Sequence, residues 1–160
     1  MKKEILKINL ERFDSYIEKS DTKASFILAI SGAILAAVFV EYKSVSSNNC
    51  ILKILLVTSL IFLIMSIIYS MLVIVPRKSI SSFKSGFYYK SISEMTTNEY
   101  KTYLDEINTE ECFEEELFSE VRELAKICNK KMIKCEKASF FLILGIIFMS
   151  FIIIVNIVLL

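Results

Sequence analysis

Three long stretches of the sequence contain no charged residue, and they constrain the fold more than any other feature. They cover residues 24–40, 54–75 and 138–160, which are 17, 22 and 23 residues long. A helix needs roughly 20 apolar residues to cross a hydrocarbon core about 30 Å thick. The stretches are apolar all round, whereas a helix of a soluble bundle has one apolar stripe. The sequence therefore predicts an integral membrane protein with three transmembrane helices.

The first stretch has a second interpretation, as the core of a cleaved signal peptide. A signal peptide begins with a short, purely basic segment. Residues 1–23 instead mix both signs of charge, with acidic residues at Glu4, Glu11, Asp14, Glu18 and Asp21. We therefore expect the first stretch to be a span that is retained in the protein.

The placement of the basic residues predicts the topology. The formal net charge is only +1, so the overall charge suggests no nucleic-acid partner. Six Lys and Arg residues lie in 1–23 and eleven in 76–137, whereas 41–53 holds only Lys43 and Lys53. Cytosolic segments of membrane proteins are enriched in Lys and Arg. We expect the N-terminus and residues 76–137 in the cytosol, and the loop 43–53 and the C-terminus outside.

Helical periodicity extends beyond two of the spans. With three Gly and one Pro, few residues can interrupt a helix. Apolar residues follow 4-3-4 spacing before the first span and again before the third, at Leu6, Leu10, Phe13 and Ile17 and at Leu117, Val121, Leu124 and Cys128. This heptad-type spacing predicts paired helices. We expect one helix from about Glu4 to about Tyr42, and a last helix of roughly 50 residues that runs into the third span.

The predicted class is thus an all-α membrane protein whose first and third helices extend into a cytosolic helical stalk. The predicted segments are an amphipathic arm (1–23), transmembrane helix 1 (24–42), an outer loop (43–53), transmembrane helix 2 (54–75), a cytosolic sensor and stalk region (76–137) and transmembrane helix 3 (138–160). Thr96 with Glu99, and Asn108 with Glu111, are capping-box signals that open helices inside 76–137.

A short sequence motif, which we call the internal echo, occurs at the start of the first span and again at the start of the third. Lys23-Ala24-Ser25-Phe26 resembles Lys137-Ala138-Ser139-Phe140. The lysine can extend to lipid phosphates, and the small pair allows close helix approach. The echo predicts two parallel helices with matched entrance registers. Chance similarity between two membrane entrances explains the echo equally well.

The sequence offers no catalytic constellation. It has no histidine, which is the usual general base, and no Gly-rich phosphate loop. The four cysteines fit no zinc-site spacing. We expect neither enzyme activity nor a metal or cofactor. The uncharged spans argue against an ion-coupled transporter. A function must come from assembly, ligand sensing or membrane perturbation, and a pore would need a homo-oligomer.

Several motifs resemble those of the transmembrane effectors of Pycsar antiphage systems (PycTM-like proteins). They are Asp21-Thr22-Lys23-Ala24-Ser25 after an arm ending in Tyr16-Ile17, Pro76-Arg77 after the second span, Gly86-Phe87-Tyr88-Tyr89 leading through Ile92 to Glu99-Tyr100, and the helix 117–137 before the last span. Their order covers nearly the whole chain. One departure is that Ser82 to Ser85 stands where the family pattern has Asn and Pro.

The resemblance implies a non-enzymatic effector of antiviral defence in the bacterial inner membrane. A partner cyclase would make a cyclic pyrimidine nucleotide, cCMP or cUMP, and the effector would respond by impairing the membrane, causing abortive infection. Two alternatives remain. One is a membrane effector of another nucleotide-signalled defence system. The other is a ligand-free structural or assembly subunit of a membrane complex.

A cyclic nucleotide presents a negative phosphate and a base that can stack, so its site needs cations beside aromatic rings. The candidate ligand-binding residues are Asp21, Lys23, Arg77, Lys78, Phe87, Tyr88, Tyr89 and Tyr100. As ordinary features of a membrane protein, the same basic residues would be topological anchors and the same aromatics an interfacial belt. Because the 77–109 segment lacks long-helix periodicity, we expect the ligand to reorder it.

Overall fold

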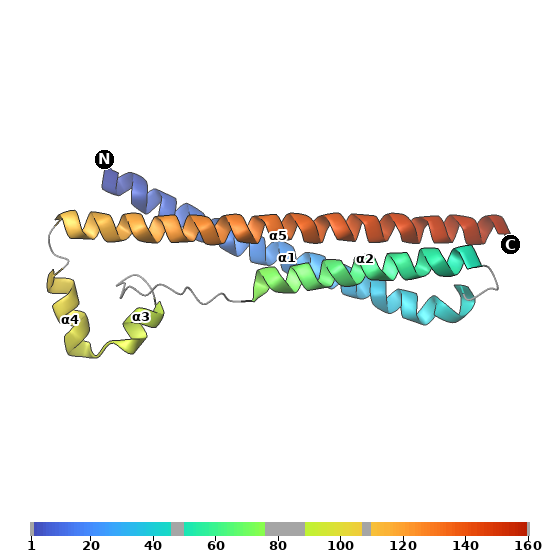
Figure 1. Ribbon diagram of the computed structural model, residues 1–160, viewed down its shortest axis with the longest axis horizontal. Helices are drawn as coiled ribbons and strands as arrows, with labels where there is room; N and C mark the ends of the chain where they lie inside the picture. The colour runs from blue at the N-terminus through green and yellow to red at the C-terminus, as the bar shows by residue number, and fades with distance from the viewer. Residues whose placement is uncertain (1, 46–49, 76–88, 107–109, 160) are drawn as a thin grey trace. The chain divides into compact units, whose positions relative to one another are not determined.

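The structure is a computed structural model that describes residues 2–45, 50–75, 89–106 and 110–159. These residues form the helices α1 (Lys2–Val45), α2 (Cys50–Ile74), α3 (Tyr89–Glu94), α4 (Thr97–Glu106) and α5 (Glu110–Leu159), as Figure 1 shows. The described residues contain no strand. Helices α1, α2 and α5 each contain a segment long and apolar enough to cross a membrane. The all-α class and the three predicted spans are confirmed.

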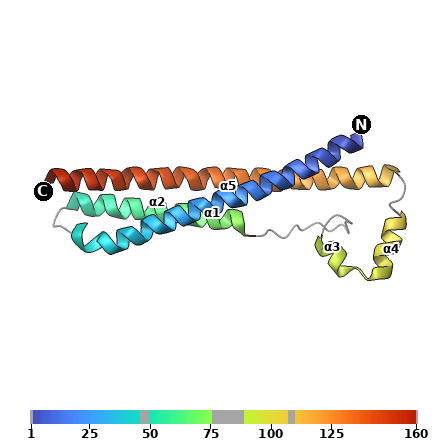
Figure 2. The same ribbon diagram turned by 180° about the vertical axis from the view of Figure 1, so that it is seen from behind.

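Helices α1 and α5 are each continuous, as predicted. They contain 44 and 50 residues, and Figure 2 shows both as uninterrupted ribbons from the opposite side. Between α1 and α2 the helices extend into the predicted loop 43–53 from both sides. Helix α1 reaches Val45 and α2 begins at Cys50. The reason lies in α2, where Leu52 is fully buried and continues the packed face of the helix by one more turn.

The chain divides into two compact units, and both long helices contribute to each of them. The first unit comprises Met1–Ile17 and Arg77–Asn129. The second unit comprises Glu18–Pro76 and Lys130–Leu160, and therefore contains the three uncharged stretches.

In the second unit, α2 packs through a single heptad-spaced face. Its buried residues follow alternating steps of four and three: Leu52, Leu56, Ser59, Leu63, Ser66, Ser70 and Val73. On α5, buried residues recur every seven positions at Lys131, Ala138, Gly145 and Ile152. This is the spacing of a coiled-coil seam. The seam is not evident from hydropathy alone, because three of its positions in α2 are serines and the lipid-facing positions are equally apolar.

Two apolar clusters hold the three helices of this unit together. One is formed around Val38, Leu52, Leu56 and Ile152, and the other around Ala24, Val73 and Cys135. Each cluster contains residues from α1, α2 and α5. Aromatic rings of α2 and α5 also stack: the ring centroids of Phe62 and Phe148 are 5.4 Å apart. The unit is therefore a three-helix assembly, with α2 antiparallel to the other two helices.

Gly145 marks the closest approach of α5 to α2. A Cβ atom at this position would lie 2.9 Å from Cδ2 and 3.0 Å from Cγ of Leu63. The hydroxyl of Ser59 donates a hydrogen bond to the Gly145 carbonyl oxygen over 3.1 Å. Gly32 differs, since a Cβ there would have no heavy atom within 4 Å. Of these two glycines, Gly145 alone is required by packing.

In the first unit, α4 begins with the predicted capping box. The backbone N–H of Thr96 donates to Glu99 Oε2 over 2.8 Å, and the backbone N–H of Glu99 donates to Thr96 Oγ1 over 3.3 Å. The second predicted box, Asn108 with Glu111, lies outside the described residues. The apolar stripes before the spans are the sheltered sides of α1 and α5, and Lys3 Nζ lies 4.8 Å from the ring centroid of Phe113. The two stripes therefore belong to one packed unit.

Candidate functional site

An ion pair joins α1 to α5 close to the start of the uncharged stretches. Lys131 Nζ lies 2.5 Å from Asp21 Oδ1. Lys131 is 6% exposed, whereas the Asp21 side chain keeps 36% of its surface accessible. A buried cation is stable only when it is paired and hydrogen-bonded. Asp21 therefore compensates Lys131, and the partly open carboxylate remains within reach of solutes.

Sequence reasoning identified Asp21 but missed Lys131. The signal was present, because Lys131 is the next heptad position after Leu117, Val121, Leu124 and Cys128. A charged residue in an otherwise apolar stripe predicts a buried, paired side chain. Beside this pair, the Ser20 hydroxyl donates to the sulfur of Met132 over 3.1 Å.

A chain of hydroxyl groups links all three helices at the centre of the second unit. Ser66 Oγ donates to the carbonyl oxygen of Ala138 over 3.0 Å, and Ser31 Oγ lies 3.0 Å from Ser66 Oγ. A hydroxyl has one proton to donate. Since Ser66 gives its proton to Ala138, Ser31 must be the donor to Ser66. The direction of the chain is thus α1 to α2 to α5.

Ser70 is the exception in this seam. It is fully buried, and its hydroxyl has no hydrogen-bond partner among the described residues. A buried unsatisfied hydroxyl costs about 1 to 3 kcal/mol. Ser70 lies one helical turn from Ser66, so the same face of α2 carries two hydrogen-bonded hydroxyls, those of Ser59 and Ser66, and one that is unsatisfied.

The two copies of the internal echo have the same local structure. Ala24 and Ala138 are both fully buried. Ser25 and Ser139 each donate to the carbonyl four residues earlier in their own helix. Direct contacts between α1 and α5, however, join residues 110 and 112 positions apart, whereas the echo is 114 positions long. Val38 and Ile152, which are 114 positions apart, share an apolar cluster, so the offset between α1 and α5 ranges from 110 to 114 positions along the pair.

The described part of the chain tests few of the predicted ligand residues. Arg77, Lys78, Phe87 and Tyr88 lie outside the described residues. Tyr89 opens α3, and its side chain also lies outside them. Of the other three candidates, Asp21 binds Lys131, Lys23 is exposed on α1 and Tyr100 is half-buried on α4. Asp21 and Lys23 belong to the second unit and Tyr100 to the first.

In the first unit, α4 is attached to α5 by a hydrogen bond from the Tyr103 hydroxyl to Glu116 Oε1. One turn further along α5, burial raises the pKa of the Glu120 carboxyl above its ordinary value. Three neighbouring carboxylates raise it further: Glu116, Asp14 and Glu123. Acidic side chains of α1 and α5 therefore repel each other where the two helices pack.

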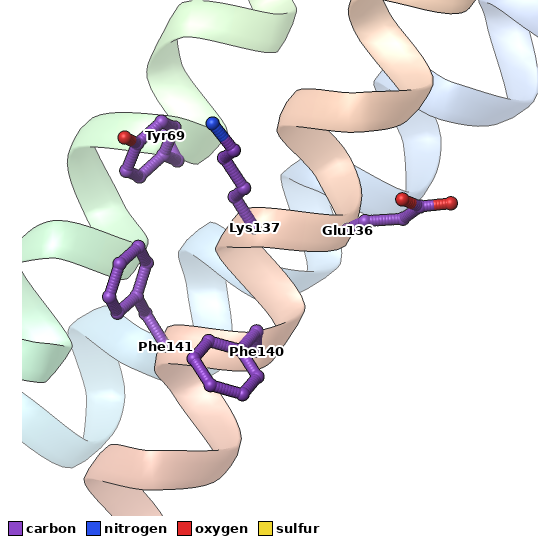
Figure 3. Close-up of a pocket in the computed structure, with 5 residues that line it drawn as sticks. All are labelled: Tyr69, Glu136, Lys137, Phe140 and Phe141. Atoms are coloured by element: carbon purple, nitrogen blue, oxygen red, sulfur yellow. The ribbon is translucent and has the colours of Figure 1, made fainter.

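A shallow pocket of about 410 Å³ opens on the side of α2 and α5 in the second unit. It is lined by Tyr69, Glu136, Lys137, Phe140 and Phe141, which Figure 3 shows as sticks. Lys137 Nζ lies 5.8 Å from the ring centroid of Tyr69, and the Tyr69 and Phe141 rings stack with centroids 5.5 Å apart. The pocket thus combines one cation with aromatic walls.

The chemistry of the described side chains is that of packing and charge pairing. Among the residues that the structure describes, no group of three or more His, Cys, Asp or Glu side chains is arranged to hold a metal ion. The described cysteines, Cys50, Cys128 and Cys135, are free thiols. What the sites can do is bind an anion at a lysine or alter the contacts between helices.

Comparison with known families gives one match that spans nearly all of the chain. The family model of the Pycsar effector protein domain, PycTM, matches residues 5–159. The match includes all three apolar helices and parts of both units. No curated protein and no solved structure gives a significant match.

Proposed function

The chain belongs to the Pycsar effector protein family, and from this premise we propose that it is the cyclic-nucleotide-gated membrane effector of an antiphage defence system. In this proposal cCMP or cUMP from a partner cyclase binds the protein and triggers loss of inner-membrane integrity, so that the infected cell stops growing. The protein performs no catalysis. The single observation that carries the proposal is the family match over a chain with three membrane-crossing helices.

The architecture supports gating by a ligand. Helices α1 and α5 each contribute residues to both compact units. A ligand that changes the packing of the first unit would therefore act on the same two helices that, with α2, form the second unit. A ligand shifts such an equilibrium only by the difference between its affinities for the two states.

The proposed orientation places the N-terminus and residues 76–137 in the cytosol, where a cyclase product accumulates. Its support is the number of basic residues in those two segments compared with the segment 41–53. A pore would require several copies of the chain, because three helices cannot enclose an aqueous channel. Homo-oligomerisation is accordingly part of the proposal.

Purified protein in dye-loaded liposomes tests the proposal directly. Addition of cCMP or cUMP should release the dye, whereas 5′-CMP and 5′-UMP should not. Lys23→Gln should raise the nucleotide concentration needed for release by about tenfold, because a charge-assisted hydrogen bond contributes about 1.5 kcal/mol. Lys19→Gln is the matched control, since Lys19 is equally exposed one turn earlier on α1.

The outcomes separate the alternatives. Equal dye release with and without cyclic pyrimidine nucleotides would refute ligand gating. Release by another cyclic nucleotide or oligonucleotide would assign the protein to a different nucleotide-signalled system. If no nucleotide binds the detergent-solubilised protein, the structural or assembly subunit becomes the better explanation.

A further inference from the structure

The charged segment 130–137 of α5 lies beside an apolar segment of α2. Ser66 of α2 bonds the carbonyl of Ala138, and Ser59 bonds that of Gly145, which fixes the antiparallel register of α2 and α5. The uncharged stretch of α2 continues for nine more residues, from Ser66 to Val75. At a rise of 1.5 Å per residue this is about 14 Å. Residues 130–137 of α5, which carry five charges, run alongside that segment.

The apolar segments at this level are exposed on the surface of the second unit. We call them the apolar collar, which consists of large exposed side chains: Phe26 and Ile30 of α1, and Ile68, Met71, Leu72 and Val75 of α2. The packing of Ala24 against Val73 and Cys135 places the start of the α1 stretch at the same level. A contiguous apolar surface of this kind is covered by lipid in a membrane protein. Lipid therefore covers the collar on the side of α2, whereas α1 carries the exposed Lys19 and Lys23 close to this level.

The position of Lys137 is then a physical problem. Its amino group lies over the ring of Tyr69, six residues inside the end of the α2 stretch, or about 9 Å along the helix. An ammonium group at acyl-chain depth is costly unless an anion or water is drawn to it. Figure 3 shows the Lys137 amino group extending toward Tyr69, whereas the Glu136 carboxylate points the opposite way. Glu136 is therefore not the compensating anion.

We propose that the pocket formed by Tyr69, Glu136, Lys137, Phe140 and Phe141 binds an anionic phospholipid, with the lipid phosphate on Lys137. The lipid phosphate is the counter-ion of the Lys137 ammonium group, which would otherwise have no anion at the depth of the collar. Phe140 is 58% exposed and offers a face for the glycerol and upper acyl chain, next to the stacked rings of Tyr69 and Phe141. The bound headgroup is drawn below the rim of the apolar collar, which thins the leaflet locally. The inference does not depend on nucleotide gating.

The chain contains no tryptophan, so Phe140→Trp creates a single fluorescent reporter inside the pocket. The reporter protein is placed in mixed vesicles, and quenching by brominated phosphatidylglycerol is compared with quenching by brominated phosphatidylcholine. We expect preferential quenching by phosphatidylglycerol. Adding Lys137→Gln should reduce that preference about fivefold, which corresponds to about 1 kcal/mol per lysine at an anionic surface. Adding Glu136→Gln should increase it.

Lys130→Gln is the matched control, because Lys130 is an exposed lysine one heptad earlier on α5 and does not line the pocket. It should leave the preference within twofold of the reporter protein. Equal losses in the two lysine variants would show diffuse attraction and overturn the proposal. Displacement of the brominated lipid by inorganic phosphate, or by cCMP or cUMP, would overturn it in favour of a soluble ligand.

A second measurement covers the case in which the tryptophan variant fails to fold. Native mass spectrometry of the unmodified protein in detergent should show retained phosphatidylglycerol, and Lys137→Gln should lose it in preference to Lys130→Gln. Equal retention of phosphatidylglycerol and phosphatidylcholine would contradict the proposal. Neither result bears on the proposed nucleotide gating, because dye release from liposomes measures a different property of the protein.

Discussion

Replacement of Gly145 by alanine tests whether the seam between α2 and α5 is as tight as the geometry requires. The new Cβ would lie 2.9 Å from Leu63 Cδ2, so the Leu63 side chain must shift, and because Leu63 is fully buried it shifts against neighbouring protein atoms. Overpacking of this kind costs about 1 to 3 kcal/mol. The shift also weakens the hydrogen bond from Ser59, which is worth about 0.6 kcal/mol in a membrane protein. Against this, alanine gains about 1 kcal/mol over glycine in helix propensity.

The expected net effect of Gly145→Ala is a loss of about 1 to 2 kcal/mol in the free energy of unfolding. Gly32→Ala is the matched control, since its Cβ would have no neighbour within 4 Å and only the propensity gain applies. The free energy of unfolding of both variants is measured in detergent, either by steric trapping or by titration with sodium dodecyl sulfate that is monitored by circular dichroism. Gly145→Ala should lower the free energy of unfolding, whereas Gly32→Ala should raise it.

A double-mutant cycle isolates the contact itself. Leu63→Ala alone creates a cavity and should cost about 2 to 5 kcal/mol. In combination with Gly145→Ala, the new methyl group enters space that the Leu63 side chain has vacated. The double variant should therefore be more stable, by about 1 kcal/mol or more, than the sum of the two single-variant losses predicts. If Gly145→Ala is as stable as Gly32→Ala, or if the cycle shows no coupling, the close approach of α2 and α5 is refuted.

Four further substitutions test the charged and polar contacts. Ser66→Ala should lower the free energy of unfolding by about 1 kcal/mol, because it removes two interhelical hydrogen bonds, whereas Ser70→Ala should raise it because a buried unpaired hydroxyl is lost. Asp21→Asn should cost about 1 to 2 kcal/mol, between the values for exposed and buried ion pairs, because Lys131 keeps a buried charge. Glu120→Gln should stabilise the protein at pH 7 by about 0.5 kcal/mol, since like charges at i,i+4 and i,i+3 spacing repel by a few tenths each. Sodium dodecyl sulfate titration in detergent measures all four variants.

The pH dependence of the Glu120 effect has a definite sign. Its pKa is raised in the folded protein, so folding binds a proton in the pH range between the unfolded and folded values, and stability falls as pH rises through that range. The gain from Glu120→Gln should therefore be complete above the folded pKa and absent below about pH 4, the ordinary carboxyl range. A gain that persists at low pH would contradict the repulsion. Equal effects of Ser66→Ala and Ser70→Ala would contradict the assigned hydrogen bonds, and a neutral Asp21→Asn would contradict the buried charge at Lys131.

Much of the fold was predictable because its signals are local in sequence. The lengths of the uncharged stretches predicted three spans, the absence of breakers predicted continuous helices, and Thr96 with Glu99 predicted the start of α4. The heptad stripes before the first and third spans predicted which sides of α1 and α5 are sheltered. Each of these inferences depends on residues within a few turns of one another.

The candidate site was predicted less well. Asp21 was identified, but its partner Lys131 was assigned to the general basic character of the membrane entrance. The echo at Ala24 and Ala138 predicts an offset of 114 positions, which Val38 and Ile152 have, whereas the contacts of Lys131 and Met132 have offsets of 110 and 112. The position of Lys137 over the ring of Tyr69 was also not predicted. Both contacts depend on the position of one helix along another.

The three uncharged stretches thus determine that the chain crosses a membrane and which segment of each long helix does so, because burial of apolar surface and satisfaction of backbone hydrogen bonds are properties of a single segment. The axial offset between helices is set by contacts between residues far apart in sequence, such as Ser66 with Ala138 and Asp21 with Lys131. Only the tertiary structure could decide it. That offset places the charges of α5 beside the apolar collar of α1 and α2.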